Sequence, residues 1–205
     1  MVVMFGIDLI QLVSTAGYFG IAAIVFAESG LFIGAVLPGD SLLFTTGLLS
    51  SRGLFDIRLM IPLLIAAAII GDSVGFSIGR KLGPRLFAKE DTRIFKKKYL
   101  VDAQKFFDKH GGKAIILARF IPAVRSFTPM IAGAANMNYG NFIKYNVFGG
   151  IFWVTLLTLL GYFLGETIPD IDKYLLPIIG GIVLLSLIPL FTEIYKAKFG
   201  KKKEE

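Results

Sequence analysis

"ESGLFIGAVLPGD", residues 28–40, places two acidic residues in an otherwise apolar stretch and interrupts the backbone beside one of them. Glu28 and Asp40 flank the segment, and a Pro-Gly pair directly precedes Asp40. A broken backbone at membrane depth is tolerated only where protein or a water-filled cavity surrounds it. We therefore interpret residues 28–50 as a re-entrant hairpin made of two half-helices with a turn near the membrane midplane.

The composition around this segment is that of an integral membrane protein. Of the 205 residues, 55% are hydrophobic and only 18% are charged. The mean hydropathy of +0.69 is too high for an ordinary soluble domain. A spanning helix requires about 20 mostly apolar residues. Four stretches meet this requirement, and they are residues 9–27, 59–79, 145–165 and 175–192.

A second apolar stretch, residues 114–135, is interrupted in the same way as the first. It contains Arg119 and Arg125, and prolines lie between and after them. We interpret this stretch as a second re-entrant hairpin. Helix breakers and small residues are expected to shape the two hairpins, and they are Pro38, Gly39, Pro122, Pro129 and Gly133.

Basic residues gather in two segments and account for the net charge of +7. Residues 80–113 contain eleven Lys or Arg, and the C-terminal tail from residue 196 contains five more. By the positive-inside rule both segments face the cytoplasm. The first hairpin then enters from outside and the second from the cytoplasm, so that they oppose each other. We expect a multi-pass protein of the cell (plasma or inner) membrane, and no nucleic-acid partner for so apolar a chain.

The two halves of the chain resemble each other. "GFSIGRKLGP" (75–84) is similar to "GYFLGETIPD" (161–170), and a charged hairpin precedes each motif at nearly equal spacing. Inverted repeats with broken helices are typical of secondary transporters, whose binding site lies where the repeats meet. The glycine motif by itself indicates close helix packing. We therefore predict an all-α membrane protein with inverted repeats and two opposed re-entrant helical hairpins.

This organisation divides a single transmembrane domain, residues 1–205, into parts. Repeat one covers about 9–83, a basic cytoplasmic connector about 84–113 and repeat two about 114–170. A C-terminal transmembrane helix at about 175–195 and the basic tail complete the chain.

The charges of the two hairpins are complementary. One charge at mid-membrane costs about 3 kcal/mol on insertion scales. Opposed hairpins allow Glu28 and Asp40 to lie near Arg119 and Arg125, which reduces that cost and creates a polar pocket. Arginine binds phosphate with two parallel hydrogen bonds. We therefore predict that these four residues bind an anionic headgroup.

Proton coupling is a second possibility at this pocket. Burial disfavours the charged form of a carboxylate, whereas a neighbouring arginine favours it. Glu28, Asp40 and a third intramembrane acid, Asp72, are the candidates for carrying a proton. The sequence leaves two roles open for Asp72, which either reaches the pocket or lines a water-filled vestibule. It also leaves open that the ion pairs only hold the hairpins in register. Trp153 is assigned to packing.

The sequence excludes several kinds of chemistry. The absence of cysteine excludes disulfides and thiolate metal sites, and the single histidine, His110, argues against a histidine-based metal site. No Ser-His-Asp, His-rich or Cys-based catalytic set is present. We therefore expect no metal, no cofactor and no enzymatic activity.

At these residues the chain resembles the DedA family of membrane proteins, also called the VTT or SNARE-associated superfamily. The resemblance covers roughly residues 10–170. It rests on four motifs. The first is Glu28 to Gly30 with Pro38-Gly39-Asp40, and the second is Gly71-Asp72 with Gly75-Phe76, Gly79-Arg80 and Gly83. The third is "RFIPAVRSFTPMIAGAANM" from Arg119, and the fourth is Trp153 with Gly161-Tyr162.

The resemblance implies a membrane lipid translocase or flippase, in a bacterial member one that moves undecaprenyl phosphate. It implies that Glu28, Asp40, Arg119 and Arg125 are essential, and that an anionic lipid phosphate, with protons, is the partner. Two alternatives stay open. One is a proton-coupled transporter of a small solute or drug, and the other is a membrane-homeostasis factor that transports nothing. The oligomeric state, including a homodimer, also stays open.

Overall fold

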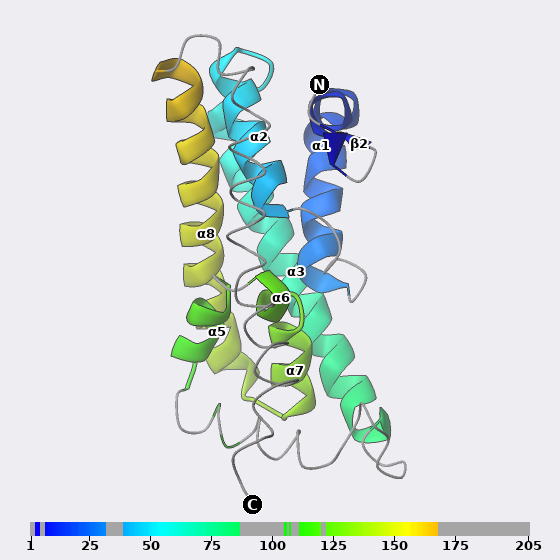
Figure 1. Cartoon of the computed structure of the whole chain (residues 1–205). Helices are drawn as coiled ribbons and strands as arrows, with labels where there is room; N and C mark the ends of the chain where they lie inside the picture. Colours follow the sequence, from blue (N-terminus) through cyan, green and yellow to red (C-terminus); the bar gives the residue numbers. More distant parts are fainter. Residues whose placement is uncertain are drawn as a thin grey trace, which may run out of the picture.

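The computed structural model describes residues 3–4, 7–31, 39–86, 105, 107, 111–119 and 122–167. Within these residues the protein is helical, apart from a minimal antiparallel ladder of two-residue strands, β1 (Val3–Met4) and β2 (Ile7–Asp8). Figure 1 shows the long helices side by side, with the short helices packed against them.

Three helices in the described part of the chain are long and apolar enough to cross a membrane. They are α1 (Leu9–Gly30), α3 (Ile57–Leu86) and α8 (Tyr139–Thr167), in which the apolar spans cover Val13–Gly30, Ile57–Gly83 and Tyr139–Thr167. Three of the four predicted spans therefore coincide with helices that are long and apolar enough to cross a membrane. The fourth, residues 175–192, lies outside the described residues, as does most of the basic connector.

The first helix differs from its prediction at the C-terminal end. Gly17 has a φ of 62°, a left-handed conformation that is easy only for glycine, and it kinks α1. The helix then continues through Gly30. The helix therefore extends three residues beyond the predicted end at residue 27, and Glu28 lies in its last turn. Close packing against α3 stabilises this last turn, because Gly30 lies directly against the backbone of Gly71.

Helix α2 (Gly39–Ser51) has 13 residues and is too short to span a membrane. From Gly39 to Ser50 all but one of its residues are buried, so it lies inside the protein rather than against lipid. Residues 32–38, which include Pro38, lie outside the described residues.

The stretch predicted to form the second hairpin contains three short helices instead of two half-helices. These are α5 (Lys113–Ala118), α6 (Pro122–Arg125) and α7 (Thr128–Ala134). Pro122 is the first residue of α6 and Pro129 the second residue of α7. Proline is tolerated in the first turn because the N–H groups there have no helical partner. Each proline thus begins a new helix rather than bending one at its centre.

The short helices pack against long helices from the other half of the sequence. Helix α2 packs mainly on α8, and α7 packs mainly on α3 (Figure 1). Asp40 and Ser51 of α2 contact Trp153 and Gly165 of α8, so these two helices run in the same direction.

Helices α3 and α7 also run in the same direction as each other. Gly75 and Gly83 of α3 lie against Pro129 and Ala134 of α7. Each short helix is therefore parallel to the long helix that carries it.

Glycine permits both contacts, and it does so in the same way. A Cβ at Gly47 would overlap the carbonyl oxygen of Thr158, and a Cβ at Gly161 would overlap that of Phe44. Each glycine thus lies against the carbonyl three residues before the other glycine. Only glycine allows backbones to approach this closely.

The contact between α7 and α3 repeats this pattern. A Cβ at Gly133 would overlap the carbonyl oxygen of Phe76, and a Cβ at Gly79 would overlap that of Met130. Here too each glycine faces the carbonyl three residues before its partner.

The apolar core has two parts, which are separated by polar residues. One part includes Met60, Leu64 and Ala68 of α3 together with Val154 of α8. The other centres on Phe76 and Phe142, whose ring centroids lie 4.5 Å apart. Between them α3 presents Asp72 and α8 presents Asn146, and both residues are buried. A polar layer therefore crosses the middle of the protein.

Candidate functional site

The polar layer contains a guanidinium group held by two acids. Arg125 ends α6, Glu28 lies in the last turn of α1, and Asp40 lies in the first turn of α2. Nη1 of Arg125 donates to Oδ1 of Asp40, and Nη2 donates to Oε1 of Glu28. The side chains of Arg125, Glu28 and Asp40 are 10%, 2% and 17% exposed. One guanidinium group thus joins the ends of three helices, and α6 lies far from α1 and α2 in the sequence.

The helix ends favour these charges. An acid in the first turn of a helix and a base in the last turn interact favourably with the helix dipole. Asp40 and Arg125 occupy these positions in α2 and α6. Gly39 allows the acids to meet, because a Cβ there would overlap the carboxylate of Glu28. Its missing side chain therefore makes room for an acidic group, in addition to the predicted role in shaping a hairpin.

A second ion pair lies in the same layer. Arg119 follows α5, and its Nη2 donates to Oδ2 of Asp72 and to Oδ1 of Asn146. Asn146 in turn donates from Nδ2 to the carbonyl of Ile69, at 3.1 Å. The Arg119 and Asp72 side chains are 6% and 7% exposed. The amide of Asn146 is therefore fixed by α3 and presents its oxygen to the arginine.

Trp153 connects the two clusters. Its Nε1 donates to Oδ1 of Asp40 at 2.9 Å. Its ring lies 4.7 Å from Cζ of Arg125 and 6.0 Å from Cζ of Arg119, both measured to the centroid, which are distances at which a cation is attracted to an aromatic face. The two arginines thus share one indole.

Each cluster keeps one unused polar atom. Oε2 of Glu28 and Nε of Arg119 are buried and have no hydrogen-bond partner within the described ranges. An unpaired buried polar atom costs about 1–3 kcal/mol. An acceptor on an acid and a donor on an arginine are therefore available to a proton or to an anion.

These contacts define which acid pairs with which arginine. The sequence suggested that Glu28 and Asp40 lie near both arginines, but Arg125 binds both acids and Arg119 binds Asp72. Of the two roles left open for Asp72, the structure favours contact with the charged layer. Among the residues expected to shape the hairpins, Pro129 and Gly133 are buried against α3.

Sequence reasoning missed Asn146 and assigned Trp153 only to packing. A signal was present, because Asn146, Gly149, Gly150 and Trp153 are spaced three, four and seven residues apart and so share one face of a helix. The two glycines on this face leave space for the Arg119 side chain, whose Cδ would lie 2.9 Å from a Cβ at Gly149.

The indole gives a direct prediction. Trp153→Phe removes the hydrogen bond to Asp40 but retains an aromatic ring beside Arg125. A hydrogen bond to a charged group contributes about 2 kcal/mol, so we expect the variant to unfold at a lower temperature. Heating the detergent-solubilised protein and measuring the remaining monodisperse fraction by size-exclusion chromatography tests this. Phe148→Leu, on an exposed part of α8, is the control. Equal thermal profiles would contradict the assigned role.

The chain matches proteins that have already been classified. Residues 37–163 match the VTT domain family. Protein DedA of Escherichia coli (strain K12) is 46% identical over 177 residues, which cover 85% of this chain and 80% of that protein. An uncharacterized membrane protein of Mycobacterium leprae (strain TN) is 46% identical over 166 residues, with 81% and 74% covered.

Inner membrane protein YqjA of Escherichia coli (strain K12) is 36% identical over 194 residues, with 90% of this chain and 87% of that protein covered. No solved structure matches the chain significantly. The VTT domain match covers α2 to most of α8 and thus includes Asp40, Asp72, Arg119, Arg125 and Trp153. This chain therefore belongs to the VTT-domain family of membrane proteins, the DedA family.

Proposed function

We propose that this protein moves the phosphate headgroup of an anionic lipid, such as undecaprenyl phosphate, across the membrane without changing it chemically. The observation that carries the proposal is the contact of Arg125 with Glu28 and Asp40 inside the polar layer. A guanidinium group binds two phosphate oxygens through the same two nitrogens. The two carboxylates therefore hold the positions that phosphate oxygens would take.

Protonation of one acid would allow a phosphate to replace that acid as a ligand of Arg125. Among the described residues the polar layer holds three carboxylates and two guanidinium groups, so one negative charge is in excess there when all are ionised. Protonation of Glu28 or Asp40 weakens its attraction to Arg125 and frees one side of the fork for a phosphate. The proton and the phosphate then bind together and travel in the same direction.

We also propose that the halves are inverted repeats with re-entrant hairpins. The two glycine contacts, Gly47 with Gly161 and Gly133 with Gly79, support this because they have the same geometry. In Figure 1, α2 and α8 run opposite to α3 and α7. The short α2 and the broken run from α5 to α7 would then meet at mid-membrane, where the charged layer lies.

The orientation in the membrane is part of the proposal. The basic end of α3 and the residues that follow it face the cytoplasm by the positive-inside rule. The name of the relative YqjA supports placement in an inner membrane. A lipid phosphate brought from the outer leaflet would therefore be released on the side of the basic connector.

A flipping assay tests the proposal. Proteoliposomes containing a fluorescent polyprenyl phosphate are treated with a membrane-impermeant reducing quencher, and wild-type protein should expose the protected lipid. Arg125→Lys keeps the charge but cannot bind two groups in parallel, so we expect at least a tenfold slower rate. Lys144→Gln, at an exposed position on α8, serves as the control. Wild-type flipping by Arg125→Lys would reject the phosphate site.

A pH gradient tests the coupling. With an acidic exterior, labelled lipid should accumulate in the inner leaflet, and Glu28→Gln should abolish this accumulation. Accumulation in the opposite direction would reject co-transport. A pH-driven solute flux without lipid movement would instead identify a small-solute transporter.

A further inference from the structure

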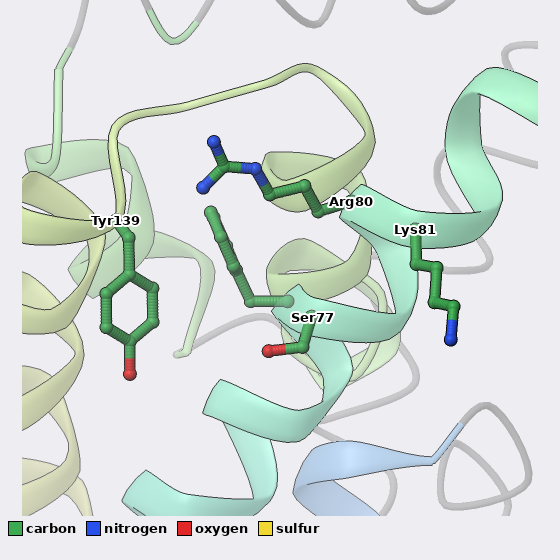
Figure 2. Close-up of a pocket in the computed structure, with 5 residues that line it drawn as sticks. Ser77, Arg80, Lys81 and Tyr139 are labelled. Carbon is green, nitrogen blue, oxygen red and sulfur yellow. The ribbon is translucent and has the colours of Figure 1, made fainter.

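A cavity lies on the surface of α3, at its basic end. Its volume is ≈ 410 Å³, and Phe76, Ser77, Arg80, Lys81 and Tyr139 line it. Figure 2 shows that Arg80 and Ser77 extend toward the side of Tyr139, whereas Lys81 extends from the other side of the helix. Within the described residues neither Arg80 nor Lys81 forms an ion pair with an acid. Among the described residues the cavity thus offers two cations without an acidic partner, together with the hydroxyl group of Tyr139.

A second cavity continues from the first along the same helix. Its volume is ≈ 340 Å³, and its lining is Ile70, Ser73, Val74, Ser77, Ile78 and Lys81. The two cavities share Ser77 and Lys81. The lining residues recur at intervals of three and four, so they form one stripe on α3. Its surface is largely apolar away from Lys81, because the hydroxyls of Ser73 and Ser77 donate to carbonyls of their own helix.

The length of this stripe matches one leaflet of a bilayer. Ile70 and Lys81 are eleven residues apart, which corresponds to about 16 Å of helix. The hydrocarbon core of a bilayer is about 30 Å thick, so one leaflet is about half of that. The apolar span of α3 ends at Gly83, which places Arg80 and Lys81 at the level of the headgroups. The stripe therefore begins at headgroup level and ends near the midplane.

We infer that this groove on α3 binds one anionic phospholipid from the surrounding leaflet, at a site separate from the buried arginines. The headgroup phosphate lies between Arg80 and Tyr139, Lys81 adds positive charge from the other side of α3, and one acyl chain follows the stripe to Ile70. Charge selects an anionic headgroup, and the apolar continuation selects a lipid over free phosphate. The site holds a lipid in equilibrium with the bilayer and does not depend on transport.

Native mass spectrometry of the full chain in detergent tests the inference. Dioleoylphosphatidylglycerol is titrated against dioleoylphosphatidylcholine, which has the same chains but no net charge. We expect a one-to-one complex that favours phosphatidylglycerol. The double variant Arg80→Gln with Lys81→Gln should lower that affinity at least tenfold. The matched control is Lys113→Gln with Lys144→Gln, which removes two exposed cations that do not line either cavity.

Two further measurements distinguish lipid binding in the groove from nonspecific electrostatic attraction to the protein. Ile70→Trp fills the far end at an exposed position without disturbing the core, and it should also weaken lipid binding. Inorganic phosphate at millimolar concentration should not displace the lipid. Equal losses in the control and the double variant, no effect of Ile70→Trp, or complete displacement by phosphate would each overturn the inference. Native mass spectrometry records binding alone. Its result therefore does not change if the flipping assay shows that the protein does not move lipid.

Discussion

Replacing Arg125 by alanine should destabilise the protein by about 3–5 kcal/mol, because it leaves the buried Glu28 and the largely buried Asp40 without their shared partner. Few single substitutions have so large an effect. The guanidinium group also faces Trp153, so the variant loses this contact as well. The expected result is a large fall in the temperature at which the detergent-solubilised protein loses its monodisperse peak, together with loss of lipid flipping.

A charge-free variant separates stability from function. Glu28→Met with Asp40→Leu and Arg125→Met removes all three charges and replaces them with apolar side chains of similar volume. Removing a whole buried ionic group is often neutral or stabilising, whereas removing one member is not. We therefore expect this triple variant to recover most of the stability but none of the flipping. Lys144→Ala, at an exposed position, is the control for the alanine substitution. Arg125→Ala with the thermal profile of that control would contradict the buried contact.

Gly47→Ala should be the second most damaging change. The added Cβ would overlap the carbonyl oxygen of Thr158, which belongs to a backbone and cannot rotate away. The helices α2 and α8 must then separate, and overpacking of this kind costs about 1–3 kcal/mol or more. We expect Gly133→Ala to have a similar effect, since its Cβ would meet the carbonyl of Phe76 in the same way. Thermal unfolding of each variant measures the loss.

Gly140→Ala is a control for which no loss of stability is expected. Gly140 is exposed near the start of α8, and a Cβ there would meet only the side-chain oxygen of Asn138, at 3.1 Å. Alanine is favoured over glycine in helices by about 1 kcal/mol, so this variant should be neutral or slightly more stable. If Gly47→Ala behaved like Gly140→Ala, the close backbone contact would not exist.

The sequence predicted the parts of the fold that depend on long apolar runs. The spans at α1, α3 and α8 follow from length and hydropathy, so they were placed to within a few residues at most ends. It also predicted that acids and arginines from the two interrupted stretches meet, because unpaired charges are costly in an apolar protein. These predictions need no knowledge of how the helices pack.

The pairing of the charges could not be predicted, because it depends on how the helices pack. Whether Arg125 or Arg119 reaches Glu28 depends on the rotation and depth of three short helices, which no local pattern determines. The division of the second stretch into α5, α6 and α7 depends on prolines that can begin a helix as well as end one. The role of Trp153 depends on α2 lying beside α8, a contact between residues more than 100 positions apart.

The exchange of short helices between the halves has a consequence for how the chain is assembled. The first half supplies α2, which is buried by α8, and the second half supplies α7, which is buried by α3. A polypeptide that ended after α3 would leave α2 uncovered in lipid, and one that began at α5 would lack the surface for α7. During synthesis the first half therefore stays incompletely folded, and folding is completed only when both halves have been inserted.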